Sequence, residues 1–398
     1  MAPKRKPDGE AMVVEDDSTS ADFAKPVFIV AERQDEQSSY SVFKIDGDCV
    51  AVAGMPGTEH GMSFVAAHSK NGSWIVAVGG GLRAGTVIFD PRTSKTYRGP
   101  RLSEPKHEPV LISHRGEVYA ISRRPRVSGR MDLDPWFECL SFNKGAPTRE
   151  DCPGAGWASW IDLPPPPFFP SVLNPYQFRN PPEISVTSYV AIGTHILISA
   201  QQDELMLGTY AFHVVNKAWE KVHDKNLPFI GQAVPLGKGS LFAACPLCNN
   251  DAAIVSVFNI KVSLSTTAPL LLTINEFPAV VASDGRICRP LFCPLGMGRF
   301  CSVMLGAFRR SRRDANYLKE IQVILDTFQT DNVLTACQSN SPEAEAAVVQ
   351  VKEGTHTYKF KGRSRLLESV TTPVLVAALS MDTENNDICE GETAETAY

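Results

Sequence analysis

The sequence predicts an all-β fold, a single β-propeller of four-stranded blades, and three observations predict it. Short β-branched runs are bounded by turn residues, one strand pattern recurs along the chain, and a C-terminal strand is available to complete the first unit. Trp74–Val78 and His195–Ser199 are two such runs. The 28 glycines and 29 prolines suit a chain with many turns. Helical periodicity is scarce, and its clearest instance, residues 315–326, also fits a strand.

A strand with a large apolar residue near its end, usually followed by a polar residue, recurs seven times. The copies are Tyr40–Asp46, Thr86–Pro91, Phe137–Asn143, Thr209–His213, Val255–Asn259, Ile321–Asp326 and Thr357–Phe360. Their spacing of roughly 35 to 70 residues is typical of propeller blades. Each copy is preceded by another apolar strand, and these strands are Val27–Ala31, Trp74–Val78, Glu117–Ser122, His195–Ala200, Ser240–Ala244, Arg299–Leu305 and Ala346–Val351.

A further strand, joined by a tight turn, precedes six of these pairs. The six strands are Ser63–Ala67, Pro109–Ser113, Ser188–Ile192, Gly231–Pro235, Pro290–Pro294 and Asn332–Cys337. The first pair has no such partner upstream, but Pro373–Ala378 supplies the missing strand at the other end of the chain. We therefore predict seven blades closed by the C-terminal strand, which removes the free sheet edges. Six blades is the alternative, because copies six and seven are the most diverged, and a pair of β-sandwiches is the competing fold.

The propeller is expected over residues 26–381, between two tails. Residues 1–25 are polar and charged with few large apolar groups, so we predict a disordered N-terminal tail. Residues 382–398 hold six acidic side chains and no lysine or arginine, so we predict a disordered acidic tail.

Composition argues against several classes of protein. The chain is 43% hydrophobic and 21% charged, which is ordinary for a globular protein. Its 39 basic and 44 acidic side chains give a net charge of −5, which argues against a nucleic-acid partner. Without a long apolar run or a signal peptide, we expect no membrane partner and a location in the nucleus or cytoplasm. In those reducing compartments the ten cysteines are expected to be buried thiols.

Two copies of the repeat resemble a kelch blade. In Gly85–Asp90 with Tyr97, and in Gly208–His213 with Trp219, a small residue, a strand and a polar turn are followed by an aromatic residue. The double glycine that follows the second strand of a kelch repeat is present once, in Gly79–Gly81.

Five segments carry a second resemblance, which covers most of residues 26–381. They are Phe89–Pro91, Gly99–Leu102, Asp134–Phe137, Trp160–Pro167 and Leu227–Phe229. They resemble a family of uncharacterised kelch-like proteins of cereal grasses, the plant domain-of-unknown-function 1668 type, which is related to F-box-associated kelch proteins. The resemblance implies a kelch-like propeller, with no activity or catalytic residue to transfer. An F-box itself is not expected, because its helices do not fit in the 25 residues before the first strand.

Loop lengths single out one face of the ring. The loops between second and third strands are long in the third and sixth blades, at Arg123–Pro135 and Ala307–Tyr317, and the longest connection between blades is Pro164–Glu183. Alternate loops of an antiparallel meander share a side, so all three lie on one face, which we call the loop-rich face. Binding residues concentrate on loops held by a rigid scaffold, so this face is the predicted binding site.

Two arginine clusters lie in these loops, and an arginine fork favours carboxylate or phosphate groups. The clusters are Arg123, Arg124 and Arg126, and Arg309, Arg310, Arg312 and Arg313. Acidic residues such as Glu32 and Glu204 are expected on the same surface, whose mixed sign suits a protein partner. Trp136 joins the candidates because tryptophan is frequent at interface hot spots, although it also fits a core position. The alternative for both clusters is a solvated loop.

Phe168 and Phe169 follow a run of four prolines, Pro164–Pro167, and are further candidates for partner binding. The run predicts a polyproline II segment, which either docks into an SH3- or WW-type groove or forms a stiff strap whose phenylalanines pack onto the propeller. The strap is the favoured interpretation.

Metal, cofactor and catalytic signals are weak. Cys245 and Cys248 have the spacing of a zinc knuckle, but Cys288 and Cys293 are spaced less usually, so we expect no metal and no cofactor. The sequence has no serine-hydrolase elbow, phosphate-binding loop or zinc-protease motif, so no catalytic residue is predicted.

The predicted function is a monomeric, non-catalytic protein-protein interaction module that binds its partner through the loop-rich face. The alternative is a hydrolase-like enzyme that uses the central channel of the propeller. A short basic block in the N-terminal tail, Lys4, Arg5 and Lys6, has the composition of a nuclear-localisation signal, with chance occurrence as the alternative.

Overall fold

Strands dominate the part of the chain that the computed structural model describes. That part comprises residues 13–14, 26–33, 39–46, 48–80, 85–124, 136–148, 159–170, 173–237, 239–247, 255–263, 270–279, 291–296, 298–310, 318–329, 354–361 and 374–381. It contains 25 strands and one short helix, α1 (Pro175–Arg179). The predicted all-β class is therefore confirmed. Within these residues, no helix has the length and apolar character needed to cross a membrane.

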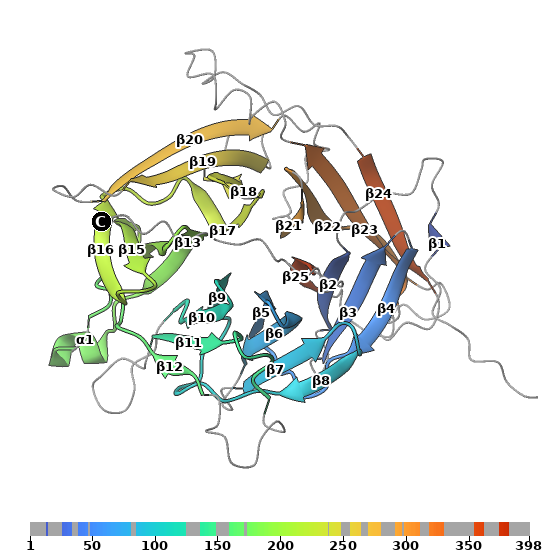
Figure 1. The fold of residues 1–398 in the computed structure, drawn as a ribbon, viewed down its shortest axis with the longest axis horizontal. Coiled ribbons are helices and arrows are strands. Elements are labelled where there is room, and N and C mark those ends of the chain that lie inside the picture. Colours follow the sequence, from blue (N-terminus) through green and yellow to red (C-terminus); the bar gives the residue numbers. More distant parts are fainter. Residues whose placement is uncertain are drawn as a thin grey trace, which may run out of the picture.

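Consecutive strands pair antiparallel into four-stranded units (Figure 1). Unit 1 consists of β25 (Val374–Ser380), β2 (Val27–Arg33), β3 (Ser39–Asp46) and β4 (Asp48–Gly54). Unit 2 consists of β5 (Met62–Ser69), β6 (Gly72–Gly79), β7 (Gly85–Asp90) and β8 (Lys95–Arg98). Unit 3 consists of β9 (Val110–His114), β10 (Glu117–Ile121), β11 (Phe137–Ser141) and β12 (Ile161–Asp162).

The second half of the chain repeats the arrangement. Unit 4 consists of β13 (Ile184–Ile192), β14 (His195–Gln202), β15 (Leu205–His213) and β16 (Ala218–His223). Unit 5 consists of β17 (Phe229–Pro235), β18 (Leu241–Pro246), β19 (Val255–Ser263) and β20 (Leu271–Ala279). Unit 6 consists of β21 (Leu291–Gly296), β22 (Arg299–Arg310), β23 (Leu318–Gln329) and β24 (Gly354–Lys361).

Three of the sheets have four strands each, and a fourth sheet has eight. The eight-stranded sheet curls through units 4 and 5, which are joined by a parallel pair between β13 and β17 that sets Ser188 opposite Gly231. Unit 6 belongs to a five-stranded sheet, whose additional strand is β1 (Val13–Val14). The described residues thus hold six four-stranded units, whose first strands lie around a common centre in Figure 1.

The number of units differs from the predicted seven. The sixth and seventh copies of the recurring strand are β23 and β24, which pair with each other from Glu320 opposite Lys361 to Thr327 opposite Gly354. Both copies therefore belong to unit 6, and the described residues fit the alternative of six. The alternation of side chains within one strand does not reveal which strand it pairs with. The prediction from the sequence therefore assigned these two neighbouring strands to two different units. The strands predicted at Asn332–Cys337 and Ala346–Val351 lie outside the described residues.

The two ends of the chain meet in unit 1. The C-terminal strand β25 pairs antiparallel with β2, from Val27 opposite Ser380 to Glu32 opposite Val374, as the sequence predicts. This pairing covers an edge of β2 that would otherwise be free. Val13–Val14, which pairs with β24, is an exception within the predicted N-terminal tail, and the rest of that tail and residues 382–398 lie outside the described residues.

In the described part of the chain, the apolar core consists of six buried clusters, each formed by two neighbouring units. Between units 6 and 1, for example, Ile29 and Phe43 pack with Cys301 and Val323. The other five clusters join units 1 and 2, 2 and 3, 3 and 4, 4 and 5, and 5 and 6 in the same way. Every unit therefore buries both of its faces against its neighbours.

Burial on both faces explains why the second strands appear in the sequence as continuous apolar runs. In β6, Trp74, Val76 and Val78 belong to the cluster between units 2 and 3, whereas Ile75 and Ala77 belong to the cluster between units 1 and 2. Successive side chains of a strand point to opposite faces, so a strand between two apolar surfaces needs apolar residues at every position.

His195, at the start of β14, gives the fold a predicted dependence on pH. Its ring is buried and lies edge-to-face with His213, with 4.8 Å between the ring centroids. Burial, and secondly the positive charge of a protonated His213, lower the pKa of His195 below its usual range. The unfolded chain therefore binds more protons at this position than the folded chain, so stability falls as the pH falls below the unfolded pKa of about 6.5.

A His195→Gln variant is expected to lose less unfolding free energy than the wild type between pH 7.5 and pH 5.5. Glutamine does not titrate, so the part of the pH dependence that comes from His195 disappears. Urea unfolding of both proteins at several pH values in this range measures the difference. Parallel pH profiles for the two proteins would contradict the assignment.

A candidate binding site at the centre of the fold

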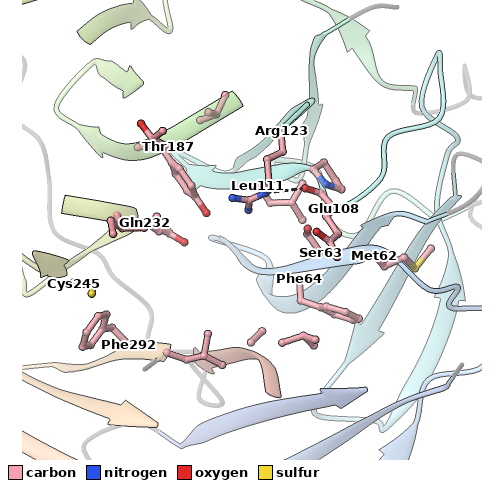
Figure 2. Close-up of a pocket in the computed structure, with 18 of the residues that line it drawn as sticks. Met62, Ser63, Phe64, Glu108, Leu111, Arg123, Thr187, Gln232, Cys245 and Phe292 are labelled. Atoms are coloured by element: carbon pink, nitrogen blue, oxygen red, sulfur yellow. Dashed lines mark hydrogen bonds between the residues drawn. The ribbon is translucent and has the colours of Figure 1, made fainter. Parts of the chain in front are cut away.

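A cavity of about 750 Å³ lies at the centre of the six units, and its size is within the range of ligand-binding pockets. Figure 2 shows the side chains that surround it. Every unit contributes, and one lining residue from each in chain order is Phe64, Leu111, Thr187, Gln232, Phe292 and Ala377. The lining mixes apolar, amide, hydroxyl and charged groups, as expected of a binding site.

The cavity lies on the predicted loop-rich face. Its lining includes Met62 at the start of β5 and Ser185 near the start of β13, together with Arg123 and Cys245 at or after the ends of the second strands β10 and β18. The first strands begin, and the second strands end, on the side of an antiparallel meander that carries the loops between second and third strands. The cavity therefore lies on the side where the second strands end.

Arg123 is a charged side chain of the cavity wall that a backbone carbonyl holds in position. Its Nε donates a hydrogen bond of 3.2 Å to the backbone carbonyl of Glu108, which Figure 2 shows as a dashed line. Its own carbonyl accepts a hydrogen bond from the Val186 amide at 3.1 Å, which links unit 3 to unit 4. Among the described residues, no carboxylate forms an ion pair with Arg123.

Tyr189 lies beside Arg123 in the same wall. Its side chain is buried, and both residues line the cavity. Burial raises the pKa of Tyr189, and the positive charge of Arg123 partly opposes this effect. The hydroxyl therefore stays protonated at neutral pH and can donate a hydrogen bond.

The carbonyl that holds Arg123 belongs to a residue in an unusual backbone conformation. Glu108 has φ of +45°, in the left-handed region, and its amide donates a hydrogen bond of 2.7 Å to the Gly61 carbonyl. Gly61 is itself at φ of +80°, and a Cβ there would lie 2.5 Å from the His107 ring. Left-handed conformations of residues other than glycine are costly and concentrate at functional sites.

A buried carboxylate lies in the wall formed by unit 1. Glu32 Oε1 accepts hydrogen bonds from the Tyr40 hydroxyl at 2.9 Å and, in the corresponding tautomer, from His60 Nδ1 at 2.7 Å. The Glu32 side chain is only 6% exposed, whereas His60 reaches into solvent. Burial and, secondly, the hydrogen bond to Glu32 raise the pKa of Tyr40. The Glu32 charge is thus satisfied within unit 1 and its connection to unit 2.

The structure places the predicted site residues in different surroundings. Arg123 and Arg124 line the cavity. Trp136 and Phe169 are buried and stacked on each other, with ring centroids 3.5 Å apart, and Phe168 packs beside them. These three aromatic residues belong to the cluster between units 3 and 4, so in this structure they face the core rather than a partner.

The proline run packs as the favoured strap. Trp219 Nε1 in β16 donates a hydrogen bond of 2.8 Å to the carbonyl of Pro164, and Phe168 packs 5.2 Å from the Tyr210 ring, between centroids. The strap joins the end of unit 3 to the outer strands of unit 4. A segment with these contacts is not available to an SH3- or WW-type groove.

The second arginine cluster is only partly described. The predicted loop Ala307–Tyr317 begins later than expected, because β22 continues to Arg310 and pairs with β23, with Arg309 opposite Glu320. The expectation of a loop at residues 307–310 is therefore wrong. Arg126, Arg312, Arg313 and the basic block Lys4, Arg5 and Lys6 lie outside the described residues, as do the side chains of Arg309 and Arg310.

The cysteine spacing does not lead to a metal site in the described part of the chain. Cys293 is buried and Cys245 lines the cavity, while Cys248 and Cys288 lie outside the described residues. Among the described residues, no group of three histidine, cysteine or acidic side chains could hold a metal ion.

Several cavity residues were not predicted from the sequence. Glu108 and Tyr189 carry no motif, and the acid Glu32 was expected only as one of several on the binding face. For Glu32 and Glu108 the available signal was their position next to strand ends on the loop-rich side, whereas Tyr189 lies within β13. Which of many such positions reach the central cavity depends on how the units pack.

The fold and the cavity define a class of protein: an all-β chain of four-stranded antiparallel units with a central cavity on the loop-rich side. The family described as Protein of unknown function (DUF1668) matches residues 24–356, and the chain belongs to this family. No curated protein matches the chain. The relation to kelch and F-box-associated proteins and the cereal-grass lineage stay predictions.

Proposed function

We propose that the chain is a closed six-bladed β-propeller with kelch-like blades, which acts as a non-catalytic protein-interaction module. Two features support the closed ring. A buried cluster joins units 6 and 1, and β25 completes unit 1 from the other end of the chain. A ring closed by such a strand has no unpaired edge at its seam, which makes it a rigid platform for binding loops.

The observation that carries the proposed function is the distribution of exposed apolar side chains. Leu205 and Met206 are 67% and 55% exposed at the start of β15, directly after the turn from β14, Leu247 is 45% exposed after β18, and Val374 is 40% exposed at the start of β25. All four lie on the side of the meander where the cavity lies. Leu247 lines the cavity together with Arg123 and Arg124. Exposed apolar side chains and arginines on one face are typical of protein-binding surfaces, which supports a partner protein on this face.

The alternative of an enzyme in the central channel has one observation in its favour. His60 is held by the buried carboxylate of Glu32, an arrangement that orients the imidazole of a general base. Among the described residues, however, no hydroxyl or thiol forms a hydrogen bond with His60, so a nucleophile activated by it is missing from this part of the chain. Binding is therefore the function that the geometry supports better.

A Leu205→Asp/Leu247→Asp variant is expected to lose partner binding. Both side chains are exposed, so the fold tolerates the change, while an aspartate in a desolvated interface costs roughly 1–3 kcal/mol or more. Val215→Asp is the matched control, because Val215 is 64% exposed but lies in the turn between β15 and β16 on the opposite side. Proteins captured from native tissue by each of the three baits are compared by quantitative mass spectrometry.

We expect at least one protein to be retained by the wild type and the Val215→Asp control and reduced about tenfold with the double variant. Equal capture by all three baits, or loss with Val215→Asp alone, would place binding elsewhere and contradict the proposal. Thermal unfolding of each bait shows whether it is folded.

A further inference from the structure

We propose that Arg123 is a carboxylate anchor, and that the partner segment entering the cavity carries an aspartate or glutamate side chain which binds it. This inference deepens the proposed function and rests on it. Arg123, Tyr189 and the strained backbone at Glu108 together form the recognition site.

The Arg123 side chain is held in place before any ligand binds. Arg123 Nε donates a hydrogen bond of 3.2 Å to the Glu108 carbonyl, and this bond orients the plane of the guanidinium. Figure 2 shows the guanidinium nitrogens directed into the cavity. With Nε occupied, the two terminal amino groups remain as a pair of parallel donors, the arrangement that binds both oxygens of a carboxylate. Tyr189 lines the same cavity, and burial keeps its hydroxyl protonated.

The backbone that holds the guanidinium is itself strained. Glu108 turns its carbonyl toward Arg123 at the cost of φ of +45°, and the hydrogen bond from its amide to the Gly61 carbonyl stabilises this conformation. Gly61 in turn has φ of +80°, a backbone conformation that favours glycine, and a Cβ there would also require the His107 ring to move. A left-handed backbone at a residue other than glycine costs free energy, and such conformations concentrate at functional sites, where they position groups for binding.

The charge of Arg123 calls for an anion when a partner covers the cavity. In the free protein water screens the guanidinium, since the cavity is open to solvent and no carboxylate among the described residues pairs with it. A partner that covered this face without an anion would bury an unpaired charge, which is strongly unfavourable. Glu32 does not serve this purpose, because its carboxylate is engaged by Tyr40 and His60.

The other charges of the cavity favour a carboxylate over a phosphate. Two arginines, Arg123 and Arg124, and two acids, Glu32 and Glu108, line the same space, so their formal charges cancel. A phosphate dianion would gain from one fixed guanidinium but would be repelled by both carboxylates. A single planar carboxylate matches one fixed fork and carries only one charge.

The surroundings favour a peptide side chain as the source of that carboxylate. From Arg123 the lining continues through the amide Gln232 to Leu247, and on the same side lie the exposed Leu205 and Met206. A peptide segment can place its acidic side chain on the guanidinium, its backbone against the amide and its apolar side chains on the leucines and the methionine.

Peptide display on the immobilised full-length protein tests the inference. One library presents random heptapeptides without a free C-terminus, and a second presents them with a free C-terminal carboxylate, so the two libraries separate side-chain from terminal carboxylates. Selection is run on the wild type, on Arg123→Met and on Arg98→Met. Arg98 is an exposed residue of the outer strand β8 and serves as the control for loss of one positive charge. Thermal unfolding checks that each variant is folded.

We expect the first library to yield sequences that share an aspartate or glutamate at one position on the wild type and on Arg98→Met, and to lose this preference on Arg123→Met. For a synthetic peptide of the selected sequence, changing the acid to its amide and changing Arg123→Met should each weaken binding about 10- to 100-fold. The two changes together should cost little more than either alone, because they remove the same contact. Arg123→Lys should restore part of the affinity.

Enriched sequences without a shared acid, additive effects of the two changes, enrichment from the second library alone, or no enrichment at all would each overturn the inference. These results are separable from failure of the proposed function. A protein whose capture depends on Leu205 and Leu247 but not on Arg123 would keep the interaction module and remove the anchor. If no captured protein depends on Leu205 and Leu247 or on Arg123, both the interaction module and the carboxylate anchor are contradicted.

Discussion

Replacing one partner of the buried ion pair between Lys106 and Glu138 is expected to lower the unfolding free energy by about 3–5 kcal/mol. The two side chains are 1% and 0% exposed, Lys106 Nζ donates to Glu138 Oε1, and Glu138 Oε2 accepts a hydrogen bond of 2.9 Å from the Ser103 amide. The pair fastens the connection between units 2 and 3 to β11. Glu138→Gln leaves the ammonium of Lys106 buried without a counter-charge. Lys106→Met leaves the carboxylate of Glu138 buried without a counter-charge.

The double variant Lys106→Met/Glu138→Gln is the informative control. It contains no buried charge, and the glutamine oxygen still accepts from the Ser103 amide, so we expect it to be more stable than either single variant. Urea unfolding followed by tryptophan fluorescence measures all four proteins. A double variant whose loss equals the sum of the two single losses would show that the two charges do not act as a pair.

Gly79→Ala is expected to destabilise the protein by about 2–5 kcal/mol, through backbone strain and overpacking together. Gly79 ends β6 with φ of +102°, and a Cβ there would lie 2.5 Å from the Lys106 carbonyl oxygen and 2.7 Å from Pro109. Neither neighbour can move freely, because the segment that contains both is held by the buried ion pair and leads into β9.

Gly57→Ala separates the two causes. Gly57 also has a left-handed backbone, with φ of +83°, but a Cβ there would meet no atom within 4 Å. Its substitution should therefore cost only the backbone strain, about 1–2 kcal/mol. The same urea measurements compare the two variants, and equal losses would contradict the overpacking at Gly79.

Much of the strand arrangement was accessible from the sequence, because a strand buried on both faces has a distinctive composition. The run Trp74–Val78 alternates between two apolar clusters, so it must be apolar throughout. The C-terminal strand β25 was predicted for a related reason: the first pair of strands lacked an inner neighbour, and an apolar strand was left over at the other end. In both cases a local pattern reflected a requirement of the whole sheet.

The number of units was not accessible in the same way. β23 and β24 have the alternation of a repeated third strand, but they are neighbours in one sheet. Hydrogen-bonding partners depend on the path of the chain between two strands, and alternation alone does not contain that information. The boundary of the loop after β22 was misplaced for the same reason, since pairing with β23 extends the strand to Arg310.

Some residues of the candidate site were also predicted from the sequence, and others were not. Arg123 was predicted from a basic cluster in a long loop on one face, and the structure places it in the cavity wall. Trp136 and Phe169 were chosen for their residue types, but they stack on each other in the core. Residue type and loop position indicate that a side chain is suited to binding, whereas burial depends on which neighbouring unit packs over it.

The amino-acid sequence by itself determined the all-β class, the order of most strands and the completing strand β25, and it predicted the face of the candidate site, because these follow from periodicity, turn residues and connection lengths. Only the tertiary structure decided that the described residues hold six units, that Glu108 turns its carbonyl toward Arg123, and that Tyr189 lies beside the guanidinium. The number of units and the place of Tyr189 depend on how neighbouring units pack, and the contact between Glu108 and Arg123 depends on how β9 and β10 pair, so alternation within one strand specifies none of them.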